Sequence, residues 1–155
     1  MAATVWTLQQ AIEKASAYCA TQERCIEEVR TKLYSWKLST EEVEQAIAEL
    51  IVQGFINEER YAKAFVRGKF RIKHWGRRKI GYELKNKRVS PMCIKSGMQE
   101  IDEAEYLEIL SQLIEKKSKE IKESNFLLKK KKLITFLIGK GFEYELINEL
   151  LNDKP

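Results

Sequence analysis

The residues of this chain best able to do chemistry are a run of cations between positions 67 and 88. This segment holds ten Lys or Arg side chains and one acid, whereas residues 1–66 carry seven cations against ten acids and residues 89–155 carry eleven against twelve. The net charge of +5 therefore arises in one segment. A localised excess of cations is typical of a surface that binds a polyanion. The candidate binding residues are Arg67, Lys69, Arg71, Lys73, Trp75, Arg77, Arg78, Lys79, Lys85, Lys87 and Arg88.

The spacing of these cations indicates two consecutive helices. Lys69 and Lys73 are four residues apart, as are Arg67 and Arg71, so each pair lies along one stripe of a helix. Trp75-Gly76 interrupts that helix, and three consecutive cations then open the next one. Cations at a helix N-terminus oppose the helix dipole. A sequence that tolerates this cost is compatible with an anion bound against the free amides at that helix start.

The alternative interpretation is an ordinary solvated surface with Trp75 as a packing residue. For Trp75 we favour packing over base stacking, whereas the ratio of ten cations to one acid favours binding for the segment as a whole. Reversal of Arg77, Arg78 and Lys79 to Glu is expected to weaken binding and to leave the helices folded, because Glu suits the first turn of a helix. A second run, Lys129–Lys132, is equally compatible with a solvated helix surface and with a second phosphate contact.

No other set of residues indicates catalysis or a metal site. The sequence lacks the motifs G-x-x-x-x-G-K-[ST], G-x-S-x-G and H-E-x-x-H, and His74 is its single histidine. Cys19, Cys25 and Cys93 form no C-x-x-C pair, so we expect them to remain thiols. The chain is therefore expected to be a non-enzyme without a cofactor or metal ion.

Composition bounds the class of protein further. The chain is 44% hydrophobic and 33% charged, which fits a folded helical protein with much surface per residue. It contains no apolar run of about 18 residues and no basic start followed by an apolar core, so we expect neither a membrane span nor a signal peptide. A cytoplasmic location and a monomeric state are the simplest expectations.

A repeat of about 50 residues organises the chain. Leu33, Leu84 and Leu137 are 51 and 53 residues apart. Apolar residues follow each leucine at offsets of five, ten and fourteen: Leu38, Val89 and Phe142; Val43, Ile94 and Ile147; Ile47, Met98 and Leu151. Stacked supersecondary units account for such a period better than one irregular core does.

Apolar spacings of three and four residues predict that each repeat consists of three helices. The expected helices are 8–20, 22–37, 40–53, 58–73, 76–88, 91–100, 103–122, 126–139 and 143–152. Capping residues support these boundaries: Ser39 with Glu42, Gly54, Asn57, Ser90-Pro91 and Asp102 with Glu105. The predicted fold is all-α, with three tandem three-helix repeats at 1–55, 56–101 and 102–155 that form an elongated, curved, right-handed-type helical array.

The middle repeat resembles the RecX family of bacterial recombination regulators. The match runs through FINEERYAKAFVR (residues 55–67) and WGRRKI (residues 75–80) to Glu83-Leu84. The family pattern is an acidic turn, an Arg-aromatic-Ala-x-x-aromatic-Val helix, a glycine and a basic-Ile-x-x-x-Leu helix. Asn57 stands where the family often has Asp, and Trp75-Gly76-Arg77 replaces a Gly-x-Gly-Pro-like turn. With the weaker flanking repeats, the similarity covers about residues 8–152.

The resemblance implies tandem three-helix repeats and a protein that binds the RecA recombinase. It implies that the protein lodges in the groove of the RecA nucleoprotein filament, where it restrains strand exchange, ATP hydrolysis and co-protease activity, and that it touches DNA. Because lysines and arginines suit phosphates and no base-reading helix is evident, we expect this DNA binding to be weak and independent of sequence. A stand-alone DNA-binding module with helix-turn-helix-like repeats is the alternative. An RNA-binding scaffold is a third option, but it would need exposed aromatic platforms, of which the chain shows few.

Overall fold

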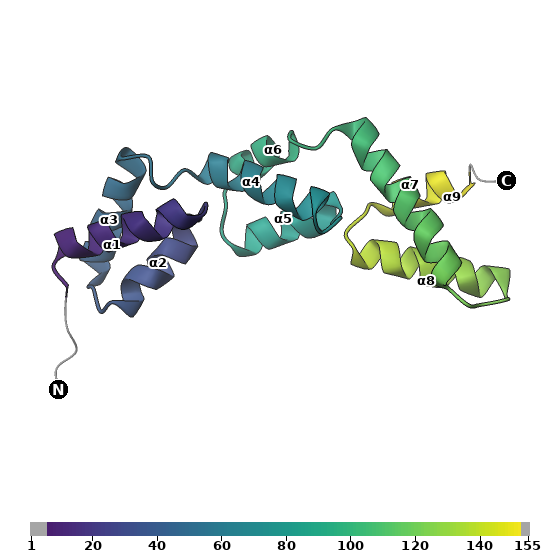
Figure 1. Ribbon diagram of the computed structural model, residues 1–155, viewed down its shortest axis with the longest axis horizontal. Coiled ribbons are helices and arrows are strands. Elements are labelled where there is room, and N and C mark those ends of the chain that lie inside the picture. Colours follow the sequence, from purple (N-terminus) through teal and green to yellow (C-terminus); the bar gives the residue numbers. More distant parts are fainter. Residues whose placement is uncertain (1–5, 153–155) are drawn as a thin grey trace. The chain divides into compact units, whose positions relative to one another are not determined.

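The computed structural model of the chain describes residues 6–152, and all regular structure in that range is helical (Figure 1). The helices are α1 (Leu8–Thr21), α2 (Ile26–Ser35), α3 (Thr40–Val52), α4 (Glu58–Arg71), α5 (Arg77–Asn86), α6 (Pro91–Met98), α7 (Glu103–Glu120), α8 (Phe126–Gly139) and α9 (Tyr144–Asn152). The predicted all-α class is confirmed, and each expected helix is present within a few residues of its expected limits.

The largest difference lies at the start of α2, which begins at Ile26 instead of residue 22. Arg24 Nε donates to the carbonyl oxygen of Tyr18 at 3.3 Å, which turns the chain back over the end of α1. Cys25 then occupies the N-cap, and its amide donates to Oε1 of Glu28 at 3.0 Å. A cap formed by a cysteine is not among the usual sequence signals for a helix start.

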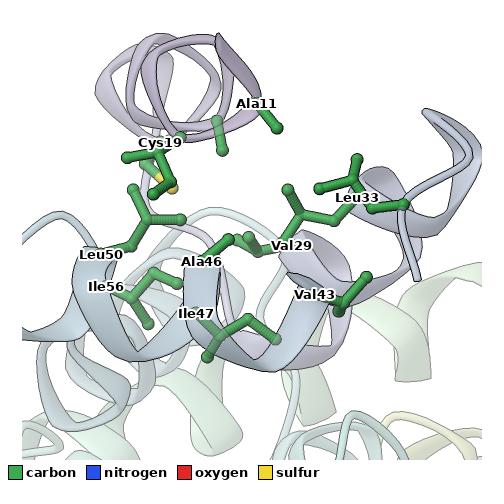
Figure 2. Packing of buried hydrophobic residues seen from close by; sticks show 12 residues of the cluster. Ala11, Cys19, Val29, Leu33, Val43, Ala46, Ile47, Leu50 and Ile56 are labelled. Carbon is green, nitrogen blue, oxygen red and sulfur yellow. The ribbon is translucent and has the colours of Figure 1, made fainter. Parts of the chain in front are cut away.

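The chain divides into two compact units, and the division falls inside helices. One unit comprises the chain up to Ala64 together with Leu84–Gly97, and the other comprises Phe65–Glu83 together with the chain from Met98 onward. In the first unit, α1, α2 and α3 pack around a core of fully or almost fully buried apolar side chains (Figure 2). Leu33 and Leu50, both fully buried, come from α2 and α3, and Ala11 from α1 lies opposite them.

Three aromatic rings form the centre of the second unit. Phe70 from α4, Tyr106 from α7 and Phe142 before α9 are buried, and their ring centroids are 5.6 and 5.2 Å apart in succession. Tilted aromatic pairs at this separation add to the stabilisation from burial itself. The rings thus join the end of α4 to helices that follow it by more than 30 residues in the sequence.

The turn after the second helix of each repeat contains a residue with positive φ. Lys37, Arg88 and Gly141 all have positive φ, at 68°, 60° and 99°. Each of the three lies four residues after one of the repeat leucines, and all three leucines are fully buried. After α5 and α8, the amide that follows the turn residue donates back to the leucine carbonyl at 3.1 and 3.2 Å, as in a Schellman motif. The repeat read from apolar spacing is therefore also a repeat of backbone geometry.

The expected caps are mostly present as predicted. Ser39 forms a full capping box with Glu42. The Asn57 and Ser90 side chains accept the amides three residues later, at 2.9 and 3.3 Å. Asp102 caps α7 in the same way at 3.0 Å. No reciprocal bond from the Glu105 side chain accompanies it; that carboxylate lies 3.6 Å from the Arg71 guanidinium instead.

The three cysteines are free thiols, as expected, and burial predicts how they react. Burial raises the pKa of Cys25 to about 11 and raises the pKa of Cys19, while Cys93 is only half-buried. Iodoacetamide at pH 8 should therefore modify Cys93 alone in the native protein and all three cysteines in urea, because the thiolate is the nucleophile. Mass spectrometry of the alkylated protein measures this. Rapid native modification of Cys25, or an intrachain disulfide, would contradict the expectation.

Candidate anion-binding surface

Six of the ten cations of residues 67–88 fall into two sets with different surroundings, and the first set is the three arginines that carry acidic partners. Arg67 forms an ion pair with Glu100, and Arg71 Nε lies 3.6 Å from Oε1 of Glu105. Arg77 pairs with two acids of its own. These acids lie in the second unit, in α7, just before α7 and in the turn before α9. Because their charges are matched within the protein, the three arginines contribute little uncompensated charge to a ligand.

Arg77 is the most enclosed of the three, with 25% of its side chain exposed. Its guanidinium donates to Oε2 of Glu143 at 2.8 Å and to Glu103, and it lies 3.9 Å from the centroid of the Tyr106 ring. Burial lowers the pKa of this guanidinium, but the hydrogen bond and charge of Glu143, with Glu103, outweigh burial and raise the pKa above its ordinary value. Arg77 therefore joins the start of α5 to α7 and to the turn before α9.

The amides at the start of α5 also have partners inside the protein. Gly76 N–H donates to the carbonyl of Lys140 at 2.8 Å, Arg77 N–H to the Tyr106 hydroxyl at 3.0 Å, and Arg78 N–H to the carbonyl of Gly141 at 2.9 Å. The expectation that free amides at this helix start receive an external anion is therefore wrong. The turn before α9 occupies that position instead. The two carboxylates that pair with Arg77 offset the unfavourable interaction between its charge and the helix dipole.

The second set is the lysines, which gather without acidic partners. Lys69 Nζ and Lys79 Nζ lie 4.8 and 4.4 Å from the centroid of the Trp75 ring. Lys140 Nζ donates to the carbonyl of Lys73 at 2.8 Å. None of the four lysines forms an ion pair with another residue in the range 6–152. We call Lys69, Lys73, Lys79 and Lys140, together with Trp75, the lysine face.

Mutual repulsion within the lysine face acts on Lys140. Burial lowers the pKa of this ammonium, and the charges of Lys79 and Lys73 lower it further. Half-buried Trp75 offsets part of this repulsion through cation–π contacts with two of the lysines. Ammonium groups held together without a counter-ion attract an external anion, and the binding of that anion would relieve the repulsion.

The remaining predicted residues lie apart from the lysine face or contribute differently. Arg78 is exposed on α5 and forms no ion pair with the described residues. Lys85 and Arg88 are exposed and Lys87 is half-buried, and all three belong to the first unit, whereas the lysine face belongs to the second. Arg88 also provides the positive-φ residue of the turn after α5.

Lys140 is the member of the lysine face that sequence reasoning missed. It lies 67 residues from Lys73, outside the basic segment, and its neighbours in the sequence are apolar residues and glycine. One signal could have identified it. Lys140 and Lys87 both precede the positive-φ residue of their repeats, so the repeat alignment places a cation at the same position of two turns.

Replacement of Arg77 by Gln tests whether this arginine is structural. Removing the cation leaves two carboxylates together, so the free energy of unfolding should fall by about 2 kcal/mol. The matched control, Arg78→Gln, removes a neighbouring exposed cation and should change that free energy by less than about 0.5 kcal/mol. Urea denaturation followed by circular dichroism measures both. The tolerance to Glu expected from the helix dipole alone does not hold at Arg77, because a third carboxylate would join Glu103 and Glu143.

Two other kinds of site are not found in the part of the chain that the structure describes. Among residues 6–152, no three His, Cys, Asp or Glu side chains come together in a way that could hold a metal ion. Within the same range, no helix combines the length and the apolar composition that a membrane span requires.

Two family profiles match the chain. Residues 57–98 match "RecX, second three-helix domain", and residues 103–151 match "RecX, third three-helix domain". Among curated relatives, "Regulatory protein RecX" of Bacillus cytotoxicus is 30% identical over 146 residues, which is 94% of this chain and 54% of that protein. The protein of the same name from Lactobacillus johnsonii is 29% identical over 144 residues, 93% of this chain and 53% of its own length. The chain thus spans about half the length of these relatives.

Solved structures share the fold. A crystal structure of RecX from Lactobacillus salivarius superimposes with a TM-score of 0.85 at 23% identity, and the match covers 94% of this chain and 95% of that one. A crystal structure of a regulatory protein RecX gives a TM-score of 0.86 at 20% identity, over 94% of this chain and 72% of that one. At these identities the structures support the all-α repeat fold alone.

Proposed function

The chain belongs to the RecX family, and on that premise we propose that it regulates the RecA recombinase by binding the RecA–DNA filament through the lysine face. The single observation that carries this proposal is the gathering of four lysines without acidic partners among residues 6–152, two of them over the ring of Trp75, in the second unit. A filament of recombinase on DNA presents phosphates and acidic side chains, and either would relieve the repulsion among these ammonium groups.

The proposed action is inhibition by binding, without catalysis. The protein occupies the groove of the filament and thereby slows strand exchange, ATP hydrolysis and co-protease activity. It acts as a monomer in the cytoplasm, where RecA works. Arg67, Arg71 and Arg77 have a supporting role in this proposal, since their acidic partners hold the lysine-bearing helices in place.

We also propose that the three repeats, 1–55, 56–101 and 102–155, are the functional subdivisions of the chain. The profile matches at 57–98 and 103–151 support the second and third of these limits. The shared turn geometry at Lys37, Arg88 and Gly141 supports the repeat in all three. The lysine face then draws on the second and third repeats, because Lys140 comes from the third.

Two variants with equal changes in net charge serve as probes. The lysine-face variant carries Glu at three positions of the second repeat: Lys69→Glu, Lys73→Glu and Lys79→Glu. The control variant carries Glu at three exposed positions of α7 and the segment after it: Lys116→Glu, Lys119→Glu and Lys122→Glu. Lys140 is left in place in both because its ammonium also bonds to a backbone carbonyl.

Single-stranded DNA should bind weakly, without sequence preference and with a marked salt dependence. If four lysines each neutralise one phosphate, log affinity should fall with log salt concentration with a slope of roughly −3. The lysine-face variant should reduce the steepness by about 2, whereas the control variant should retain it. Fluorescence anisotropy at several salt concentrations measures the slope. Sequence-selective binding without salt dependence would contradict the proposal.

The alternative function is a stand-alone DNA-binding module with helix-turn-helix-like repeats. A binding assay with RecA in the absence of DNA distinguishes the two functions. A module that acts only on DNA should show no such binding, whereas a regulator of the recombinase should retain it.

A further inference from the structure

The third repeat carries a cleft that the lysine face does not use. It lies among α7, α8 and α9 and has a volume of about 560 Å³. Three apolar side chains, Phe126, Leu133 and Leu151, and two half-buried lysines, Lys129 and Lys130, contribute most of its lining. Such a combination of apolar walls with a few placed cations suits a ligand that is both apolar and anionic.

Apolar side chains beside this cleft are also unusually exposed. Phe126, Leu127 and Leu128 form the first turn of α8 and are 75%, 73% and 48% exposed. Single exposed apolar residues are ordinary on protein surfaces, but three consecutive large ones next to a cleft mark an interaction site. Of the cations that follow them, Lys132 lies 3.4 Å from Glu123, whereas Lys129–Lys131 form no ion pair within residues 6–152.

The equivalent positions of the other two repeats show which groups are bound where Lys130 lies in the third repeat. Lys130 precedes its repeat leucine by seven residues, as Arg77 does in the second repeat. Arg77 holds the carboxylates of Glu103 and Glu143 and lies against the ring of Tyr106. The second repeat therefore binds two acids and one aromatic ring at the position that Lys130 occupies in the third.

In the first repeat, a backbone amide binds an acid at the equivalent position, seven residues before the repeat leucine. Ile26 precedes Leu33 by seven residues, and its amide donates to Oε1 of Glu58 at 3.2 Å. Glu58 is the first residue of α4, and Glu103 is the first residue of α7. In both repeats, one carboxylate at this position thus comes from the first residue of the helix that begins the next repeat.

The third repeat differs because α8 begins one turn earlier than α2 and α5. Asn125 caps α8, so the amide of Lys130 lies inside the helix and is not free to receive a carboxylate. The side chains of Lys129 and Lys130 are then the available donors. The added turn supplies the exposed apolar surface, since Phe126, Leu127 and Leu128 all belong to it.

We propose that this cleft binds an acidic segment of a partner protein that presents an aromatic side chain beside its carboxylates. The lysines pair with the acids, and the aromatic ring enters between Phe126, Leu133 and Leu151. A second copy of this chain is a poor occupant. Its first helix has Leu8 and Ala11 at the positions where α7 has Glu103 and Tyr106. The proposal is independent of the lysine face.

A peptide with the sequence of residues 101–110 is a suitable probe, because it contains Glu103 and Tyr106, the acid and the aromatic residue that Arg77 contacts in the second repeat. A labelled form should bind the full chain saturably in fluorescence anisotropy. A peptide with Gln or Asn in place of its four acids should bind about tenfold more weakly. Lys129→Glu with Lys130→Glu should weaken binding by a similar factor and keep the fold, because Glu is favourable near a helix N-terminus.

The matched control for charge is Lys14→Glu with Lys95→Glu, at two exposed positions of the first unit, which should leave peptide binding within about twofold of the unchanged chain. Equal losses in the two variants would overturn the proposal in favour of general charge attraction. Absence of saturable peptide binding would also overturn it. Phe126-dependent self-association without peptide binding would assign the cleft to a second copy, and Phe126-dependent binding to anionic vesicles alone would assign it to a lipid surface. None of these outcomes would contradict the function proposed for the lysine face.

Discussion

A Gly76→Ala protein is expected to lose about 3 kcal/mol or more of the stability of the second unit. A Cβ atom at Gly76 would overlap the carbonyl group of Gly141 and the amide nitrogen of Phe142, which are backbone atoms and cannot rotate away. The Gly76–Lys140 and Arg78–Gly141 backbone hydrogen bonds, at 2.8 and 2.9 Å, would have to lengthen together. Overpacking usually costs about 1–3 kcal/mol, and a backbone contact lies at the upper end of that range.

Two other glycines provide matched controls for this substitution. Gly68 in α4 and Gly139 at the end of α8 have no atom within 4 Å of an added Cβ. Replacing either by alanine should be neutral or should stabilise the protein by up to about 1 kcal/mol, because alanine restricts the unfolded chain. Urea denaturation compares the three variants, and hydrogen exchange at Gly76 and Arg78 localises the effect. A Gly76→Ala protein as stable as the Gly68→Ala protein would contradict the described contact.

The helices and their repeat could be predicted from the sequence because they depend on local spacing. The leucine period sets Leu33, Leu84 and Leu137 in equivalent turns, and the structure places all three in the core. The cap at Ser39 was predictable for the same reason, since a capping box needs only a serine and a glutamate three residues later. Such signals act within one turn of helix and need no knowledge of distant segments.

The division of the basic segment into paired and unpaired cations could not be predicted in the same way. Arg67 and Lys69 look alike in a count of charges, yet Arg67 pairs with Glu100, 33 residues away, and Lys69 contacts Trp75. The planar guanidinium suits fixed ion pairs, whereas the ammonium is a flexible point charge, which is consistent with this sorting. Helix periodicity predicts the face of the helix on which a residue lies, but it does not predict which acid of a distant segment pairs with that residue.

The contact between Gly76 and Gly141 is equally absent from local signals. The two residues are 65 positions apart, and each is explained separately by a turn. Their close approach depends on how α5 packs against the turn before α9. The same packing brings Lys140 to the lysine face, so one long-range contact accounts for both features that the sequence did not reveal.

The lysine-face variant is expected to lose most of its ability to inhibit RecA. Replacing Lys69, Lys73 and Lys79 by Glu turns three attractions to an anionic filament into repulsions. At about 1.4 kcal/mol for each of the three close pairs, the concentration needed for half-inhibition should rise about a thousandfold. The fold should persist, because none of the three lysines forms an ion pair with residues 6–152 and all three lie at least partly exposed. Circular dichroism is the control for folding.

The most direct test of the account is a titration of RecA's DNA-dependent ATP hydrolysis with three proteins: the unchanged chain, the lysine-face variant and the control variant. We predict inhibition by the unchanged chain and by the control variant at concentrations below that of RecA, because one molecule bound in the groove can restrain many neighbouring subunits. The lysine-face variant should leave hydrolysis almost unchanged at those concentrations. Full inhibition by the folded lysine-face variant, or no inhibition by the unchanged chain against RecA of the same organism, would contradict the account.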